Sequence, residues 1–187
     1  MSDERDASAW PAELELLLER HPRATWPSAA SPSAAFWLDV HEHLRRDAVG
    51  LVAAGSDYAS GRSSPAQLAV IAAPRLRGLI AAMHGHHQIE DLHYFPAFRS
   101  AEPRFAAAFD RLETDHASLH GSVEAALAAL AELRNAAERP EPAAATAQQL
   151  AAQRYVAAAA HLASALLRHL EDEENLVVPL LIERRDY

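Results

Sequence analysis

The spacing of apolar residues predicts a chain made almost entirely of helices. Apolar side chains recur every three or four residues, as at Phe36, Val40, Leu44 and Leu51, and this is the period of an α-helix. No stretch alternates strictly between apolar and polar residues, as a half-buried strand would. We therefore expect an all-α protein.

Proline and glycine divide this pattern into four long helices. The first is expected to start at Ser33, a candidate N-cap, and to end before a loop that begins at Gly55. Pro74 predicts a break or kink inside the second helix. The expected helices cover 33–54, 66–94, 103–137 and 146–183, with ends at Phe95-Pro96 and at Pro140 and Pro142. Four such helices with short connections favour an up-down-up-down four-helix bundle.

Residues 1–33 form an N-terminal extension in this interpretation, and 34–187 form the bundle. The stretch AELELLLER predicts one short helix, which ends at His21 because a residue before proline leaves the helical region. Pro27 and Pro32 predict that the rest of the extension is irregular.

Charge and composition exclude several classes of function. The 187 residues suffice for one domain with a hydrophobic core. The absence of cysteine excludes disulfides, thiolate zinc sites, iron–sulfur clusters and cysteine nucleophiles. The net charge of −9 disfavours nucleic acid and anionic membranes as partners. The polar N-terminus lacks the pattern of a signal peptide, and we see no long apolar run, so we expect a cytoplasmic protein without a membrane helix.

Histidine and glutamate recur at a spacing suited to metal binding. Residues four apart on a helix point to nearly the same side, and three pairs have this spacing. The pairs are His86/Glu90, His116/His120 and His169/Glu173, and His41 supplies a ligand from a further helix. The same motif occurs twice in the chain. His86 and Glu90 precede Pro96 at the same spacing as His169 and Glu173 precede Pro179. Inward-facing pairs on neighbouring helices of a bundle can surround one site.

These five imidazoles and two carboxylates are too many ligands for one four-coordinate zinc ion. They suit two metal ions that share both carboxylates. Imidazole with carboxylate suits iron, and manganese and zinc accept the same ligand types. In the repeat, Arg45 of the first helix occupies the position that His120 occupies in the third helix. One ion is therefore expected to have fewer protein ligands and an open position.

The other histidines leave alternatives open. His87 competes with His86 for the face of Glu90, and we favour His86 because its spacing matches the repeat. His43 and His84 are expected to face solvent. His93 is expected to line a channel or support the ligands, and His161 to lie in the core or to support the ligands. Asp91, Asp172 and Glu174 either hold metal-bound histidines or belong to a solvated acidic face.

Four motifs together resemble the hemerythrin family, in its bacterial HHE cation-binding branch. The first motif is His41 with Leu44 and Arg45, and the other three are HHQIEDLHYFP, DHASLH and HLEDEENLVVP. The resemblance covers roughly 35–183. It implies a four-helix bundle around a non-haem di-iron centre that two carboxylates and an oxo or hydroxo group bridge. By motif match the metal ligands are His41, His86, Glu90, His116, His120, His169 and Glu173. The glutamate of the last motif differs from the aspartate of the invertebrate oxygen carriers.

This resemblance implies a protein that binds a small ligand, namely O2, NO or peroxide, at two iron ions. Two other functions would use the same centre. One is a di-iron oxidoreductase that removes peroxide or NO or oxidises a substrate, and the other is an iron or redox sensor. The sequence shows no protein partner domain, and it leaves open whether the protein is an enzyme.

Overall fold

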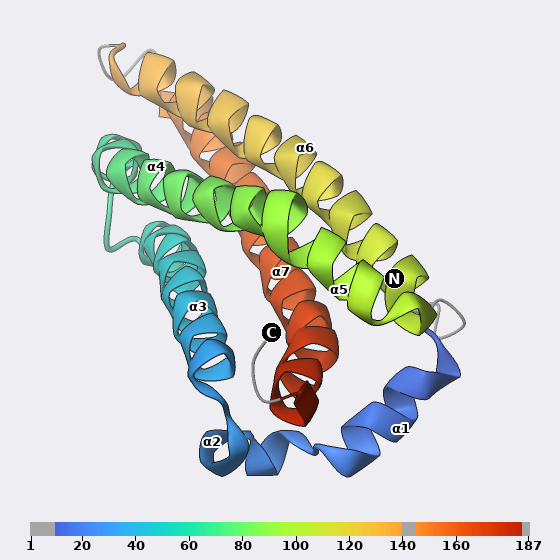
Figure 1. Ribbon diagram of the computed structural model, residues 1–187. Helices are drawn as coiled ribbons and strands as arrows, with labels where there is room; N and C mark the ends of the chain where they lie inside the picture. The colour runs from blue at the N-terminus through green and yellow to red at the C-terminus, as the bar shows by residue number, and fades with distance from the viewer. Residues whose placement is uncertain (1–9, 140–144, 185–187) are drawn as a thin grey trace. The chain divides into compact units, whose positions relative to one another are not determined.

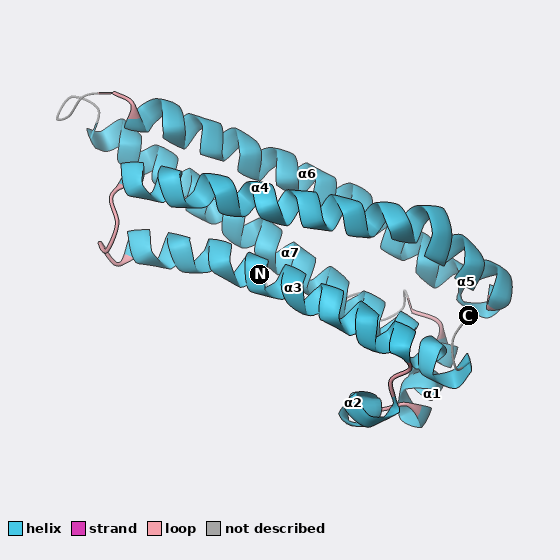
Figure 2. Ribbon diagram, turned by 60° about the vertical axis from the view of Figure 1, so that its left-hand side comes forward, coloured by secondary structure: helices cyan, strands magenta, loops and turns pink. Residues whose placement is uncertain are grey.

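Every element of the described chain is a helix. The computed structural model describes residues 10–139 and 145–184, and no strand occurs within those ranges (Figure 2). This confirms the all-α prediction, whereas the up-down-up-down bundle stays a prediction. The expected breaks at Pro140 and Pro142 lie outside the described residues.

Four long helices carry most of the chain. They are α3 (Pro32–Ala59), α4 (Pro65–Ile89), α6 (Ala106–Ala137) and α7 (Ala145–Arg184), which follow one another along the chain in Figure 1. The loop predicted at Gly55 is wrong, because α3 continues through that residue. Gly55 is buried, and a Cβ atom there would lie 3.1 Å from Cγ1 of Val156 on α7. The glycine therefore allows close packing of α3 against α7 rather than a break.

The extension is more helical than the sequence indicated. Helix α1 (Ala12–Arg20) ends at His21 as expected. A 3-10 turn η2 (Arg23–Thr25) and the short helix α2 (Trp26–Ala29) follow where an irregular segment was predicted. Pro27 lies in the first turn of α2, where a missing N–H group costs no hydrogen bond.

The cap of α3 is Ser31 rather than Ser33. The backbone N–H of Ala34 donates to Oγ of Ser31 over 3.2 Å, and Pro32 occupies the first helical position. A serine N-cap followed directly by proline is a favoured helix start. Proline here begins the helix instead of extending the irregular segment.

The second predicted helix does not end at Phe95-Pro96. After α4, which contains Pro74 without ending there, a π-helical turn η3 (Glu90–Tyr94) leads into α5 (Phe95–Ala101). Pro96 again lies in a first turn. A second 3-10 turn, η4 (Pro103–Phe105), then leads into α6.

The chain forms two compact units, and each contains a portion of all four long helices. The first unit comprises Met1–Glu42, Gln88–Asp115 and His169–Tyr187, and the second comprises His43–His87 and His116–Arg168.

The core of the first unit is rich in aromatic residues. Phe109 packs against Phe95 and Phe98, with ring centroids 5.4 Å apart in both pairs. Trp26 of the extension is buried in the same cluster. Phe36 was expected on the buried face of α3, but it is 63% exposed and its neighbour Trp37 is buried. The buried face of α3 includes the predicted Leu44 and Leu51, but at its start it runs through Trp37 instead of Phe36.

The second unit has a core of leucine and alanine. Along α4 the buried positions recur at intervals of three and four residues, which is the helical period. They are Leu68, Ala72, Leu76, Leu79 and Met83. The guanidinium of Arg75 donates to the carbonyl of Gly50 over 3.0 Å and so ties α4 to α3 within this unit.

One helical stretch passes a composition test for a membrane span. The stretch Pro65–Ala101 contains an 18-residue window with mean hydropathy 1.3, of which 33% is buried. The core helix of a soluble protein passes the same test, so this result alone does not assign a membrane to the protein. The expectation that the protein has no membrane partner stays a prediction.

Candidate metal centre

Four buried residues that the sequence predicts as metal ligands lie in the first unit. His41 lies on α3, Glu90 opens the π-helical turn η3, and His169 and Glu173 lie on α7. None of the four side chains is more than 3% exposed. Ligand atoms of His41, Glu90 and Glu173 all lie within 4.8 Å of one another. All four were predicted as ligands from their spacing and from the motifs.

Glu173 faces two histidines with different oxygens. Its Oε1 lies 3.4 Å from Nε2 of His41, and its Oε2 lies 3.3 Å from Nε2 of His169. A carboxylate that presents one oxygen to each of two imidazoles has the orientation needed to bridge two cations. That Glu173 is shared by two metal ions stays a prediction.

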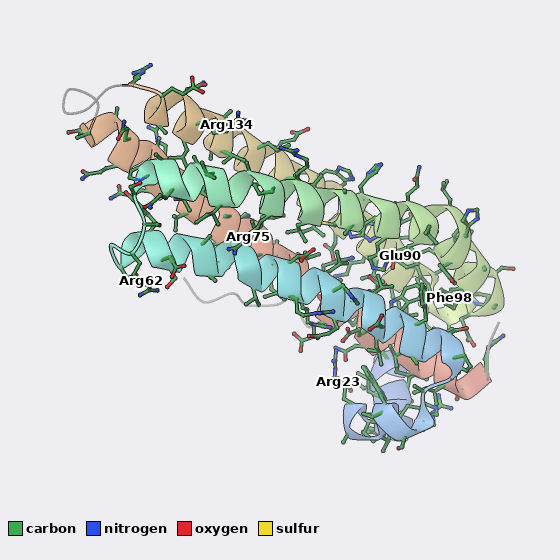
Figure 3. All side chains as sticks on the ribbon, turned by 90° about the vertical axis from the view of Figure 1, so that its left-hand side faces the viewer. Arg23, Arg62, Arg75, Glu90, Phe98 and Arg134 are labelled. Carbon is green, nitrogen blue, oxygen red and sulfur yellow. The ribbon has the colours of Figure 1, made fainter. Side chains whose placement is uncertain are left out.

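Glu90 stands at the point where the helix changes its winding. Figure 3 labels Glu90 and, further along the same helical stretch, Phe98. π-helical turns of this kind recur at functional sites. Burial and the nearby charge of Glu173 raise the pKa of Glu90 well above its usual range. Two buried carboxylates this close favour either a shared proton or a bound cation.

His41 is held from both sides by carboxylates. Its Nδ1 lies 3.1 Å from Oε1 of Glu174, while its Nε2 faces Glu173. Burial lowers the pKa of His41, but the charges and hydrogen bonds of Glu173 and Glu174 outweigh burial and raise it to about 9. Glu174 is itself 1% exposed, so of the two alternatives it supports a ligand rather than a solvated face.

The second unit contains a pair of stacked histidines. The rings of His87 and His116 lie 3.8 Å apart and nearly parallel, at 7°. Their ligand nitrogens lie within 4.8 Å of each other. His86 is half-buried next to this pair, with its ring 5.7 Å from that of His87. Both adjacent histidines are thus candidates, although the spacing of the repeat favoured His86 alone.

His120 does not join His116. His120 is exposed, and its ring faces the exposed His84 at 6.1 Å. The pattern of buried residues on α6 explains this, because Leu112, His116, Leu119 and Val123 follow each other at helical spacing and His120 lies beyond the edge of their face. This signal was already in the sequence. The residue that the structure pairs with His116 is His87.

Two further histidines were expected near the centre. His161 was expected in the core or beside the ligands, and this expectation is wrong because His161 is exposed. His93 on η3 is exposed as well. His43 and His84 face solvent as predicted.

The donor set of the first unit fits a metal cation. It combines two imidazoles with two carboxylates and contains no thiolate, which suits iron and related divalent ions. The carboxylates also supply the negative charge that a buried cation needs. A His/Glu cluster of this kind fits a metal site.

Comparison with known proteins agrees with this interpretation. The family model described as hemerythrin HHE cation-binding domain matches residues 33–181. Among curated proteins no match was found, and no solved structure matches the chain either. The matched region includes every ligand candidate and leaves out most of the N-terminal extension. The chain therefore belongs to the hemerythrin HHE cation-binding domain family.

Proposed function

We propose that this protein binds two iron ions and, at those ions, a small ligand such as O2, NO or peroxide. The observation that carries the proposal is Glu173, whose two oxygens face His41 and His169. His41, His169, Glu90 and Glu173 would hold the ions, and the two carboxylates would supply the negative charge that both ions need.

We propose that further histidines of the family motifs are also metal ligands. His86 precedes Glu90 by four residues, as His169 precedes Glu173, and would serve as a ligand in the same way. The stacked pair of His87 and His116 would offer two further imidazoles for metal binding. His87 thereby replaces His120 in the ligand set suggested by the motifs.

Charge balance supports two divalent ions with this ligand set. Two such ions bring four positive charges, and Glu90, Glu173 and one bridging hydroxide bring three negative charges. The remaining single positive charge is tolerable in a buried site with neighbouring carboxylates such as Glu174. A site with imidazoles alone would leave all four charges uncompensated.

The bound iron would supply reversible one-electron chemistry and an open coordination position. The protein side chains bury the site, exclude water and hold the imidazoles in place. Histidine-rich coordination is less anionic than the carboxylate-rich coordination of ferritin-like oxidases. It therefore favours ligand binding over the oxidation of strong C–H bonds.

The decisive test is metal analysis and an optical spectrum of the aerobically purified protein. We expect two irons per chain and oxo-bridge absorption, and a spectral change when O2 meets the reduced protein. Glu173→Gln should bind iron at least about tenfold more weakly, because a bridging ligand is lost. Glu171→Gln on the same helix is an exposed control and should bind as the wild type does.

Two results would contradict the proposal. The first is a wild-type protein that takes up no iron, and the second is equal iron binding in Glu173→Gln and Glu171→Gln. Turnover of peroxide or NO by the iron-loaded protein, lost in Glu90→Ala, would instead place the protein among the enzymes.

A further inference from the structure

Through Arg23 the N-terminal extension contacts Glu174, the residue that holds His41 of the candidate metal centre. This residue precedes the region matched by the family model. Its guanidinium binds three groups on α7 at 2.9 to 3.0 Å. They are the carboxylate of Glu174, the side-chain oxygen of Asn175 and the backbone carbonyl of Glu171. Figure 3 labels Arg23 on the short helical segment before α3.

Glu174 connects Arg23 to His41. Its Oε2 accepts from Nη1 of Arg23 at 3.0 Å, and its Oε1 lies 3.1 Å from Nδ1 of His41. The opposite ring nitrogen of His41 faces Glu173. A continuous line of contacts therefore runs from Arg23 through Glu174 and His41 to the carboxylate proposed as a bridge.

Along this line of contacts each charged or polar group faces a group of complementary charge. A carboxylate that accepts from Nδ1–H of a histidine fixes the ring and leaves Nε2 as the metal-binding nitrogen. Glu174 is buried and lies next to Glu173 in the sequence, so its negative charge needs a compensating cation. Arg23 provides that cation with two donors to the side chains of α7.

Arg23 is also held in place on its own segment. Its guanidinium lies over the ring of the buried Trp26, 4.6 Å from the centroid. The indole N–H of Trp26 in turn donates to the carbonyl of His21 over 2.8 Å. The position of Arg23 is thus set by the docked extension and not by the long helices alone.

We propose that Arg23 is a positioning residue for the metal centre, which it supports by holding Glu174 in contact with His41. This inference rests on the proposed function, because it takes His41 to be a metal ligand. It makes docking of the N-terminal extension a condition for tight metal retention. A segment outside the matched domain then regulates the centre.

Arg20 offers a matched control. It belongs to the same extension and forms an ion pair with Glu183 on α7. Loss of Arg20 removes one contact between the extension and α7, and loss of Arg23 removes three. Of the two arginines, Arg23 is the one that contacts the carboxylate beside His41. A changed metal spectrum in the Arg23 variant alone therefore reports on the centre, whereas weaker docking is common to both variants.

The experiment uses the full chain loaded with Co²⁺, whose visible spectrum reports on ligand geometry, and measures metal loss to excess chelator. We expect Arg23→Gln to lose metal about tenfold faster, as is typical when the partner of a metal ligand is removed, with an altered Co²⁺ spectrum. Arg23→Lys keeps the charge and should recover part of the effect. Arg20→Gln should match the wild type in both measurements.

A double mutant tests the route through Glu174. Arg23→Gln should add nothing further in a Glu174→Gln background, because the connection is already broken. Additive effects would overturn the inference, and so would equal metal loss in Arg23→Gln and Arg20→Gln. A wild-type protein that binds neither Co²⁺ nor iron would overturn the proposed function itself, so the two failures are distinguishable.

Discussion

His41 and the two carboxyl groups of Glu90 and Glu173 lie within 4.8 Å of one another inside the first unit. Without a metal, His41 and Glu90 keep their protons to higher pH than usual, because the pKa of each is raised. A bound cation would replace these protons. The residues that we propose as ligands therefore also make the metal-free protein sensitive to pH.

The first prediction concerns this sensitivity. A histidine whose pKa rises from 6.5 to about 9 on folding stabilises the fold fully below pH 6.5, and the contribution disappears as the pH rises through 9. Glu90 acts in the same direction, since its stabilisation is present below its ordinary pKa of 4.5 and is lost at higher pH. The unfolding free energy of the metal-free protein should thus fall by on the order of 3 kcal/mol between pH 6.5 and 9.

Denaturant titrations of the metal-free protein at several pH values measure this slope. His41→Gln should flatten it, whereas His161→Gln, which changes an exposed histidine, should leave it unchanged. Stability that stays level or rises over this range in the wild type would contradict the prediction.

At the scale of elements, the start of α3 tests how serine and proline define a helix. Ser31→Ala should lower the unfolding free energy by about 1 kcal/mol, because the N–H group of Ala34 loses its acceptor. Ser33→Ala should have little effect, since the cap lies two residues earlier. Thermal or urea unfolding distinguishes the two variants, and a larger loss in Ser33→Ala would restore the cap suggested by the sequence.

A second element-scale prediction concerns α5, the helix that continues past Pro96. Phe98 is 1% exposed and stacks on Phe109, so Phe98→Ala should cost about 3 to 5 kcal/mol of stability. Leu92 on the π-helical turn is 62% exposed, and Leu92→Ala should stay within about 0.5 kcal/mol of the wild type. Chemical denaturation provides the measurement, and equal losses would show that α5 does not contribute to the core.

The sequence predicted helices better than it predicted where they begin and end. Proline occurs at either end of a helix, so Pro32 and Pro96 were assigned to breaks although both open a helix. The difference depends on whether the residues after the proline find a packing partner. Phe98 continues the helix because Phe109, eleven residues further along the chain, gives it such a partner, and no local pattern shows that contact.

The candidate ligands also show which features the local sequence predicts and which depend on contacts between distant residues. Spacing predicted Glu90, His169 and Glu173 as ligands, because residues four apart share a helix face, and the repeat and the family motifs added His41. The choice between the adjacent His86 and His87 depends on which ring meets a partner from α6, and His87 stacks on His116. The contact of Arg23 with Glu174 joins positions 151 residues apart, and nothing in the spacing of the motifs indicated it.

At the scale of the whole molecule, a bound metal should stabilise the fold as any ligand of the native state does. At a free metal concentration one hundred times the Kd, the gain is about 2.7 kcal/mol, which raises Tm by roughly 5 to 10 °C for a chain of this size. Calorimetry of the iron-loaded and chelator-treated protein measures the shift. Glu173→Gln, which should bind at least about tenfold more weakly, should lose about half of this shift or more at the same metal concentration. An equal shift in that variant would point to metal bound elsewhere.

The hydrophobic core of the first unit includes residues outside the region that the family model matches. The family match begins at residue 33, yet Leu14, Leu17 and Trp26 before it are at most 6% exposed and belong to that core. A fragment trimmed to the matched residues would therefore expose hydrophobic surface. We expect it to bind dyes such as ANS and to precipitate more readily than the full chain. Protein prepared for crystallisation or assay should accordingly retain the chain from at least Trp10.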